Sequence, residues 1–376
     1  MPVDALTGAI KLKTNEPLKP YTTFKIGGPA DFFAEVCSED ELRQALNFRD
    51  SKNLDLFVLG GGSNILVSDR GFVGLVVRTA LRGLRVEDEN DREAVLRIGA
   101  GETWDQVVDF AVKHGWWGIE NLSHIPGQAG AALVQNIGAY GQQVSDILRS
   151  ATVMAVNTSE VKILTGADCQ MGYRRSLFNS THKNRFVILN SVLVLKKQGR
   201  PILDYPDVKA YFQTAGTSSP SLPEIREAIV RIRDSKFPFP KEEKGGNAGS
   251  FFKNLTLEES EYANLLRDVR REFGAEAANR LGQIRNRFPT ATRIKIPTAF
   301  LMEICGLKGL QHGGAKVNET QPLVLLNTGG ATASDVLGLA RQIRQTVFRR
   351  TGMKISLEPE LVGFGESEKA QYFALA

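Results

Sequence analysis

The stretch GNAGSFFKN, residues 246–254, contains a serine that could take part in chemistry. Ser250 follows small residues, precedes two phenylalanines and has no histidine near it in the sequence. It lacks the GxSxG elbow of hydrolases, since Ala248 precedes Gly249 and Phe251 follows, and a serine without a paired base is a poor nucleophile. Its hydroxyl could instead donate a proton to a far more basic group, such as a carbanion or an enolate. A plain loop serine is the alternative interpretation.

Charged and aromatic side chains elsewhere could serve such chemistry. CQMGYRRSLFN holds Arg174, whose guanidinium could bind a carboxylate through two hydrogen bonds. ISLEPELVGFG contains Glu358 and Glu360, which point to one face if this segment is extended. LDYPDV places Tyr205 beside a turn. For each of these residues, the alternative is an ordinary solvated side chain.

Two glycine-rich stretches favour a cofactor site. VLGGGSNILVSD puts Gly60, Gly61, Gly62, Ser63 and Asn64 between strands, where converging N–H groups could bind an anion. No GxGxxG or GxxxxGK[ST] pattern is present, so a Rossmann site is disfavoured. The segment 125–141 is rich in glycine and alanine, so a large flat ligand could lie close to its backbone. Tight turns and close strand packing remain the alternatives.

Composition narrows the class of protein. The chain has 376 residues, of which 42% are hydrophobic and 24% charged. Its net charge is only +5, and basic and acidic residues are interspersed along the sequence. This mixture is weak support for nucleic-acid binding. The three cysteines and four histidines form no CxxC or HExxH pattern, which disfavours a zinc site or a disulfide framework and fits a reducing compartment. The sequence shows no signal peptide and no apolar run that could span a bilayer. We therefore expect a cytoplasmic protein without a metal.

Caps and periodicity predict the elements that must position these residues. A capping box opens a short helix within residues 38–48, and apolar residues share one helical face within 101–115. Further helices are predicted from Pro223, from residue 256 and from Ser334 to Gly352. Several β-branched stretches in 151–200 predict strands. The chain should thus be α+β, with a domain boundary in the Pro/Lys/Glu/Gly segment after the helix that starts at Pro223.

Read together, these stretches resemble the UDP-N-acetylenolpyruvoylglucosamine reductase family, flavoenzymes of bacterial peptidoglycan precursor synthesis and so of cell wall biogenesis. Seven motifs follow the family's order along nearly the whole chain: YTTFKIGGPADFF, LGGGSNILVSD, LSHIPGQAGAALVQNIGAYG, YRRSLFN, GNAGSFFKN, GLQHGGAKV and LEPELVGFG. The LDYPDV segment is similar to the family subtype that closes a tyrosine loop over its substrate.

The resemblance implies a fold and an activity. The fold would be an FAD-binding region of the vanillyl-alcohol-oxidase (PCMH) type over residues 1–233, with two α+β subdomains divided near 75–85. A smaller α+β substrate-binding domain would follow over 234–376, with its last strand returning Glu360 to the active site. The activity would be that of a UDP-N-acetylmuramate dehydrogenase, an oxidoreductase with non-covalent FAD and NADPH as co-substrate. It reduces UDP-N-acetyl-3-O-(1-carboxyvinyl)-glucosamine to UDP-N-acetylmuramate. We expect a monomer that binds this nucleotide sugar and NADPH, but neither nucleic acid nor membrane.

The resemblance also assigns roles to single residues. Ser250 matches the family's proton donor, and Arg174 and Glu360 match the two residues that stabilise the enol intermediate. Tyr205 and Lys236 resemble the residues that contact the uridine-diphosphate part, and Asn254 and Gln311 would line the same site. The FAD-binding positions implied by the resemblance are Gly60, Gly61, Gly62, Ser63, Asn64, Ile125, Pro126, Gly127, Gly130, Ala131, Asn136, Gly138, Ala139 and Gly141.

Some positions depart from the family pattern. Leu255 follows FFKN where proline is usual, Arg175 stands where an acidic residue is frequent, and residues 256–295 look longer and more charged. Two rival functions fit the same motifs. One is another flavin oxidase or dehydrogenase with a different small substrate, and the other is a nucleotide-sugar binding protein without catalytic activity.

Overall fold

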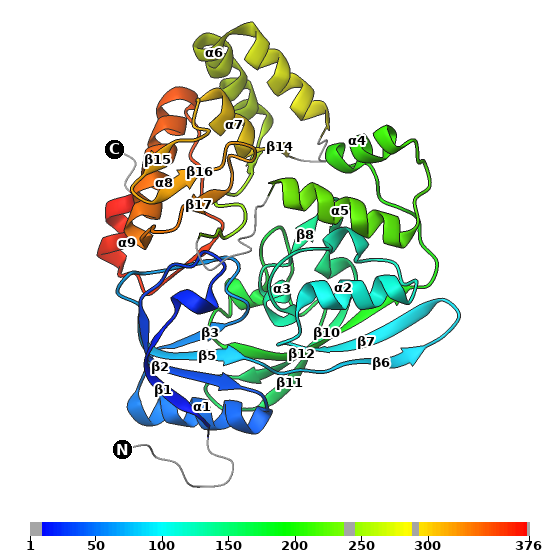
Figure 1. Ribbon diagram of the computed structural model, residues 1–376, viewed down its shortest axis with the longest axis vertical. Helices are drawn as coiled ribbons and strands as arrows, with labels where there is room; N and C mark the ends of the chain where they lie inside the picture. Colours follow the sequence, from blue (N-terminus) through cyan, green and yellow to red (C-terminus); the bar gives the residue numbers. More distant parts are fainter. Residues whose placement is uncertain (1–9, 237–244, 288–292, 374–376) are drawn as a thin grey trace. The chain divides into compact units, whose positions relative to one another are not determined.

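The computed structural model describes residues 10–236, 245–287 and 293–373, which form two compact units (Figure 1). Of these residues, unit 1 comprises 10–16, 30–62 and 73–235, and unit 2 comprises 17–29, 63–72 and everything from Lys236 onward. The segment 237–244, where the sequence predicts a domain boundary, lies outside the described residues.

Unit 1 is built on two sheets. The first has the order β1-β2-β5-β3, with β1 (Leu12–Pro17), β2 (Pro29–Val36), β5 (Phe72–Thr79) and β3 (Leu56–Leu59). The second has the order β11-β10-β12-β7-β6, with β11 (Val161–Thr165), β10 (Leu148–Ala155), β12 (Phe186–Lys196), β7 (Glu93–Gly99) and β6 (Leu84–Glu89). The chain passes from the first sheet to the second between Thr79 and Leu84.

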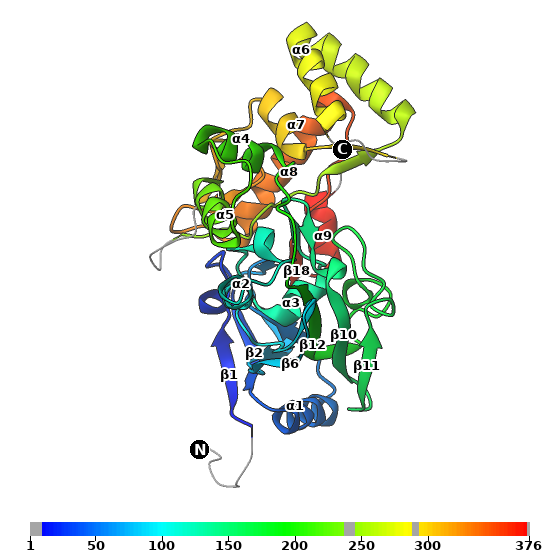
Figure 2. The same ribbon diagram turned by 90° about the vertical axis from the view of Figure 1, so that its right-hand side faces the viewer.

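Buried side chains of β12 point alternately to the two faces of the second sheet, and helices cover both faces. Val187 and Leu189 pack with buried residues of α1 (Glu39–Lys52), whereas Ile188 packs in the cluster of α2 (Trp104–Lys113) and α3 (Ala129–Val134). Side chains of successive strand residues point to opposite faces, so a run of apolar residues can serve two cores. Figure 2 shows α2 and α3 on the side of the sheet away from α1.

Two further helices, α4 (Pro206–Ala215) and α5 (Leu222–Lys236), adjoin residues that are expected to bind substrate. α4 begins directly after Tyr205, with proline at its first position, and α5 ends at Lys236. Their apolar faces share one buried cluster with Tyr140. Tyr140 follows a short hairpin strand, β8 (Gly138–Ala139), which pairs with β9 (Gln142–Gln143).

Unit 2 surrounds one core with helices and short strands. Its helices are α6 (Glu259–Arg287), α7 (Thr298–Ile304), α8 (Ala333–Thr351) and α9 (Glu366–Phe373). Its strands pair as β13 (Leu255–Leu257) with β14 (Ile294–Ile296), as β15 (Gln311–His312), β16 (Ala315–Val317) and β17 (Leu325–Asn327), and as β18 (Glu360–Val362) with β4 (Ile65–Val67). A non-helical glycine, Gly274 at φ +86°, divides α6 into two arms.

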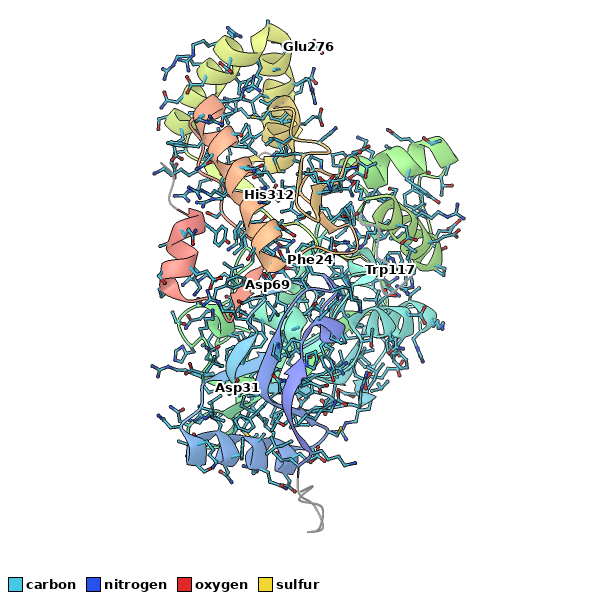
Figure 3. All side chains as sticks on the ribbon, turned by 60° about the vertical axis from the view of Figure 1, so that its left-hand side comes forward. Phe24, Asp31, Asp69, Trp117, Glu276 and His312 are labelled. Atoms are coloured by element: carbon cyan, nitrogen blue, oxygen red, sulfur yellow. The ribbon has the colours of Figure 1, made fainter. Side chains whose placement is uncertain are left out.

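Two early segments of the chain belong to unit 2 for clear physical reasons. Phe24 is fully buried in the core of unit 2, and β4 pairs in parallel with β18. The Asp69 carboxylate accepts the backbone N–H groups of Ala333 and Ser334 at 2.7 and 3.0 Å, which stabilises the N-terminus of α8 (Figure 3 labels Phe24 and Asp69).

The sequence predicted the principal helices, but two of their starts were wrong. The cap of α8 is Thr332 rather than Ser334, and Thr256 lies in β13, so that α6 begins only at Glu259. Ser38 caps α1, α2 buries the predicted apolar face, and Gly352 ends α8 at φ +68°. The strands expected in 151–200 are β10, β11 and β12. One departure from the family pattern also has a structural reason: Leu255 pairs with Ile296 in β13, and a proline there would lack an N–H for such a ladder.

No helix among the described residues has the length and hydropathy of a membrane span. The same residues contain no cluster of three or more histidine, cysteine, aspartate or glutamate side chains that could hold a metal ion.

Candidate functional site

The expected cofactor segments of unit 1 pack backbone against backbone. A Cβ atom on Gly61 would lie 2.6 Å from the Gly127 Cα, and one on Gly60 would lie 2.9 Å from the Ala131 Cβ. Separations this short exclude a side chain at either position without a shift of the neighbouring chain. The turn after β3 therefore lies directly on the loop that leads into α3. Gly130 continues this packing, because its Cβ would approach the Ala100 Cβ at 2.8 Å.

A buried acceptor beside this turn fits the expected FAD. The Gln128 side chain is 7% exposed, and its Oε1 has no hydrogen-bond partner among the described residues. The same Oε1 lies 3.4 Å from the Cβ position of Gly60, so it is next to the glycine turn. An unsatisfied buried acceptor costs free energy unless a ligand donates to it, and FAD offers amide, hydroxyl and amine donors. The residues present thus fit the group.

The remaining expected cofactor residues divide between the units. Ile125 packs against the α2–α3 core, and Gly138 and Ala139 form β8 in unit 1. Gly141 has φ +88°, a conformation that favours glycine. Ser63 and Asn64 are the first residues of the 63–72 segment of unit 2.

Unit 1 also groups the expected substrate residues Arg174 and Tyr205. Burial raises the pKa of the Tyr205 hydroxyl, and the charge of Asp207 raises it further, whereas the charge of Arg174 acts in the opposite direction. The Tyr205 ring packs edge-on against Tyr140, with ring centroids 5.2 Å apart. The Tyr140 hydroxyl has a hydrogen bond with Arg233, a guanidinium that is almost fully buried. Two arginines and two tyrosines therefore lie together on unit 1.

Arg174 itself sits in an unusual backbone conformation. It occupies a tight turn in which Gly172 and Arg175 exchange backbone hydrogen bonds of 2.9 and 3.1 Å. Its φ is +52°, a region that costs a non-glycine residue about 1–3 kcal/mol and is concentrated at functional sites. One guanidinium nitrogen donates to the Gly138 carbonyl at 3.2 Å, so the side chain leans toward the glycine-rich hairpin.

In unit 2, neighbouring segments hold Ser250 from both sides. Ser250 forms a β-bridge with Val324, and the Phe251 N–H donates to the Leu323 carbonyl at 2.7 Å. On the other side the Glu358 N–H donates to the Phe251 carbonyl at 3.0 Å. Phe251 and the residue after it are fully buried, which anchors the segment in the core. Within the described part of the chain, no group hydrogen-bonds to the Ser250 hydroxyl.

Glu360 belongs to the same neighbourhood of unit 2. It lies two residues beyond Glu358, and its N–H donates to the Asn64 carbonyl at 3.1 Å. Asn64 also reaches the Glu358 carbonyl with its side chain at 3.5 Å. The Asn254 Oδ1 accepts the Thr298 N–H and so fixes the start of α7. Unit 2 thus gathers Ser250, Glu360 and Asn64 through adjacent strands.

Two expected substrate residues lie elsewhere on unit 2. Gln311 is exposed in β15 and donates to the Gly313 carbonyl at 3.1 Å. Lys236 ends α5, and its carbonyl accepts the Asn318 side chain at 3.3 Å. A different glutamine, Gln321, is half-buried. It lies close to Ser250 in the fold, because its carbonyl accepts the N–H of Val324, the residue that bridges with Ser250.

The structure therefore adds residues that the sequence did not single out. Tyr140 stands between two of the expected cofactor positions, and Arg233 precedes Lys236 by three residues on the same helix. The sequence could have indicated both residues, because each lies close in the sequence to an expected site residue. No sequence pattern indicated Gln321, since only the structure shows that its segment pairs with residues 250–251.

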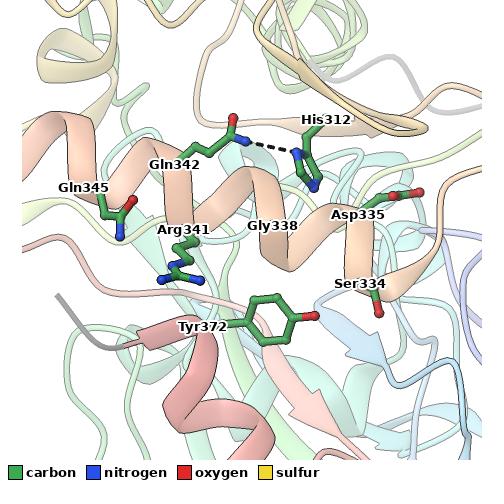
Figure 4. Close-up of a pocket in the computed structure, with 8 residues that line it drawn as sticks. All are labelled: His312, Ser334, Asp335, Gly338, Arg341, Gln342, Gln345 and Tyr372. Carbon is green, nitrogen blue, oxygen red and sulfur yellow. Dashed lines mark hydrogen bonds between the residues drawn. The ribbon is translucent and has the colours of Figure 1, made fainter. Parts of the chain in front are cut away.

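A cavity of about 440 Å³ on unit 2 is a poor candidate for the site (Figure 4). It lies along α8, and His312, Arg341 and Tyr372 are among its lining residues. The Asp335 carboxylate in its wall already accepts the Thr332 and Gly314 N–H groups. None of the residues expected to bind cofactor or substrate lines it.

Comparison with known proteins identifies the family. A model of the UDP-N-acetylenolpyruvoylglucosamine reductase C-terminal domain matches residues 240–362, and an FAD binding domain model matches 30–164. The reductase of Flavobacterium johnsoniae is 35% identical over 94% of this chain and 100% of its own length. The chain belongs to the UDP-N-acetylenolpyruvoylglucosamine reductase family. The reductases of Pseudomonas putida and Burkholderia multivorans are 36% and 37% identical, covering 92% and 96% of this chain and 97% and 99% of their own.

The fold of the family is also found in solved structures. A UDP-N-acetylenolpyruvylglucosamine reductase from Thermus caldophilus aligns with a TM-score of 0.63 and 23% identity, covering 94% of this chain and 98% of its own. The expected α+β class and the FAD-binding region of the vanillyl-alcohol-oxidase type are confirmed by this likeness and by the domain match over 30–164.

Proposed function

We propose that this chain reduces the enolpyruvyl group of UDP-N-acetyl-3-O-(1-carboxyvinyl)-glucosamine to give UDP-N-acetylmuramate, with NADPH as the electron source. The observation that carries the proposal is membership in the reductase family over nearly the whole chain, with curated relatives covered along almost their full length. When bound, FAD supplies hydride transfer from NADPH to the terminal carbon of the enolpyruvyl group. The remaining chemistry falls to side chains of this protein.

We assign the proton to Ser250. Addition of a hydride to the terminal carbon leaves negative charge on the adjacent carbon and its carboxylate, which makes a strong base. A neutral hydroxyl can protonate such a base if it is held at hydrogen-bond distance. The anchoring of Phe251 on both sides fixes the backbone at Ser250, and no described group occupies its hydroxyl. Position rather than acidity would then make this serine effective.

Arg174 and Glu360 would stabilise the negative charge. The planar guanidinium of Arg174 suits a carboxylate through paired hydrogen bonds. Glu360, in its protonated form, would donate a hydrogen bond to the developing oxyanion. Removing one such preorganised donor costs about 3–4 kcal/mol, or roughly a hundred- to a thousandfold in rate.

Binding of the nucleotide part would use residues at the ends of helices. Tyr205 and Lys236 would contact the uridine-diphosphate, and Asn254 and Gln311 would line the same site. Tyr205 is the better supported, because it lies with Arg174, Tyr140 and Arg233 on unit 1. We further propose a monomer that works in the cytoplasm. The two buried cysteines are free thiols, which suits a reducing compartment.

A steady-state assay tests the proposed function. The purified protein should release FAD on heating and should oxidise NADPH when the enolpyruvyl UDP-sugar is added, with UDP-N-acetylmuramate appearing by mass spectrometry. UDP-N-acetylglucosamine, which lacks the enolpyruvyl group, is the matched control and should support no oxidation. Equal NADPH oxidation with both sugars, or no muramate product, would contradict the proposal and favour another flavin oxidase.

A further inference from the structure

The turn that carries Arg174 is tied to the glycine-rich segment by one buried amide. Asn136 is 2% exposed and lies just after α3. Its Nδ2 donates to the Gly172 carbonyl at 3.1 Å. The same carbonyl closes the turn by accepting the Arg175 N–H at 3.1 Å. The Asn136 side chain thus holds the first residue of the turn through an oxygen that also defines the turn.

The Asn136 amide is itself locked in one orientation. Its Oδ1 accepts the Ser145 N–H at 2.9 Å, and its Nδ2 also donates to the Ser145 hydroxyl at 3.2 Å. A flipped amide would place an acceptor against the Gly172 carbonyl and a donor against the Ser145 N–H. Because the contacts with the Gly172 carbonyl and the Ser145 N–H each fit only one orientation, the Nδ2 must face the turn.

A second amide holds the other end of the turn. The Asn179 Nδ2 donates to the Arg174 carbonyl at 3.2 Å, and its Oδ1 accepts the Ser176 N–H at 2.9 Å. The Ser176 hydroxyl donates to the Val134 carbonyl at 2.6 Å, which returns the network to the end of α3. The short helix Leu177–Asn179 therefore extends the same anchor.

These bonds explain how Arg174 keeps a left-handed backbone. A residue with a side chain persists at such a φ only where the surrounding structure holds it. Here the carbonyls of Gly172 and Arg174 are both bound by buried or half-buried amides. Loss of one bond would let the turn relax toward a negative φ and swing the guanidinium away from its present position near the Gly138 carbonyl.

We infer that Asn136 is a positioning residue for Arg174: it holds the 172–175 turn in the conformation from which the guanidinium reaches substrate. The inference rests on the proposed role of Arg174 in the reaction. The Asn136 side chain bonds to Ser145 and to the Gly172 carbonyl, and these bonds use both hydrogens of its Nδ2.

The variant Asn136→Asp isolates the bond to the turn. An aspartate keeps the oxygen that accepts the Ser145 N–H but replaces the donor that faces Gly172 with a second acceptor. The matched control is Asn190→Ala. Asn190 lies in β12 of the same unit, where its side-chain oxygen accepts bonds from Arg97 and Thr152. Asn136→Ala serves as a second variant without added charge.

The first readout is the split between the two half-reactions. In both Asn136 variants, compared with wild type at equal bound flavin, reoxidation by the enolpyruvyl UDP-sugar should slow about ten- to a hundredfold more than reduction by NADPH does, because misplacement of a catalytic group affects only the step that uses it. Combined with Arg174→Ala, Asn136→Asp should add less than about twofold, since both changes act through one side chain. Fully multiplicative effects, or equal slowing of both half-reactions, would overturn the inference.

The second readout does not depend on activity. Trypsin cleaves after arginine, and cleavage after Arg174 and Arg175 should be at least about fivefold faster in Asn136→Asp than in wild type or Asn190→Ala, because the turn opens more often. Mass spectrometry of the peptides measures this rate alone. An unchanged rate of cleavage after Arg174 and Arg175 would show that Asn136 does not hold the turn, whether or not the proposed reaction is correct. If wild type does not reduce the sugar but cleavage at the turn is still faster in Asn136→Asp, then Asn136 holds the turn and the proposed function is wrong.

Discussion

At the scale of single residues, the proposed chemistry needs side chains that are held in fixed positions rather than strongly acidic or basic groups. No histidine lies near Ser250 in the sequence, and this favours a proton donor over a nucleophile, because a nucleophile needs a base whereas a proton donor to an enolate needs a fixed position. Arg174 shows the same principle through its backbone, which sits at φ +52° within a hydrogen-bonded turn.

The guanidinium of Arg174 can be tested against its neighbour in the same turn. Arg174→Lys keeps the charge but loses the planar fork, so reoxidation by the enolpyruvyl sugar should slow by roughly ten- to a hundredfold while reduction by NADPH is unchanged. Arg175→Lys is the control, because Arg175 is exposed and occupies the next position of the turn. Stopped-flow absorbance measures both steps. If the two substitutions have equal effects, Arg174 does not bind the substrate carboxylate.

At the scale of elements, an ion pair joins α5 to α2 and also contacts the loop before α3. Arg226 binds both oxygens of Asp105 at 2.7 and 2.9 Å and lies 3.3 Å from Asp109. The other Asp105 contact is the His124 N–H, in the loop that precedes α3. Burial alone would raise the pKa of Asp105, but the hydrogen bonds from Arg226 and His124 outweigh it and lower the pKa below its ordinary value of 3.8.

This lowered pKa predicts a defined pH dependence of stability. The carboxylate contributes stability above pH 3.8, and that contribution is lost as pH falls through the lower pKa of the folded state. Asp105→Asn should therefore lower the free energy of unfolding at pH 7 by about 1–3 kcal/mol and should weaken its dependence on pH below 4. Urea unfolding at several pH values measures both effects.

Glu227→Gln provides the comparison for Asp105→Asn. Glu227 pairs with Arg231 on the exposed surface of the same helix, where such pairs contribute little. A loss of stability at pH 7 that is as large in Glu227→Gln as in Asp105→Asn would show that the α2–α5 ion pair has no special weight.

The helices could be predicted from the sequence because caps and periodicity are local signals. Ser38 and Gly352 mark helix ends at positions where the structure also ends them. The pairing of β4 with β18 joins residues almost 300 positions apart, and no local pattern encodes it. For the same reason the anchoring of Ser250 by Leu323 and Glu358 became visible only in the structure.

At the scale of the whole molecule, both units bury thiols and phenols whose ionisation opposes folding. Burial raises the pKa of Cys169 in unit 1 and of Cys305 in unit 2 from 9.0 to about 11. Burial likewise raises the pKa of Tyr140 from 10.0 to about 12, although Arg233 acts against this. The folded state thus retains protons that the unfolded chain gives up at alkaline pH.

The resulting prediction is loss of stability above pH 9. Each group whose pKa is raised in the folded state contributes stability below its unfolded pKa, and the contribution is lost as pH rises through the folded pKa. Between pH 9 and 11, each buried thiol should lower the free energy of unfolding by about 1.4 kcal/mol per pH unit. Urea unfolding from pH 8 to 10.5 should show a flatter decline in Cys169→Ala/Cys305→Ala than in wild type. Parallel declines would show that these thiols do not titrate with folding.

The assignment of Ser250 as the proton donor of a UDP-sugar reductase is tested most directly by anaerobic half-reactions. NADPH is added first to wild type and to Ser250→Ala, and the enolpyruvyl UDP-sugar is added once the flavin absorbance has bleached. We predict that NADPH bleaches both proteins at rates within about twofold, and that the sugar restores the absorbance about a hundred to a thousand times more slowly in Ser250→Ala. Recovery at the wild-type rate in Ser250→Ala would contradict the role of Ser250, and no recovery in wild type would contradict the proposed reaction.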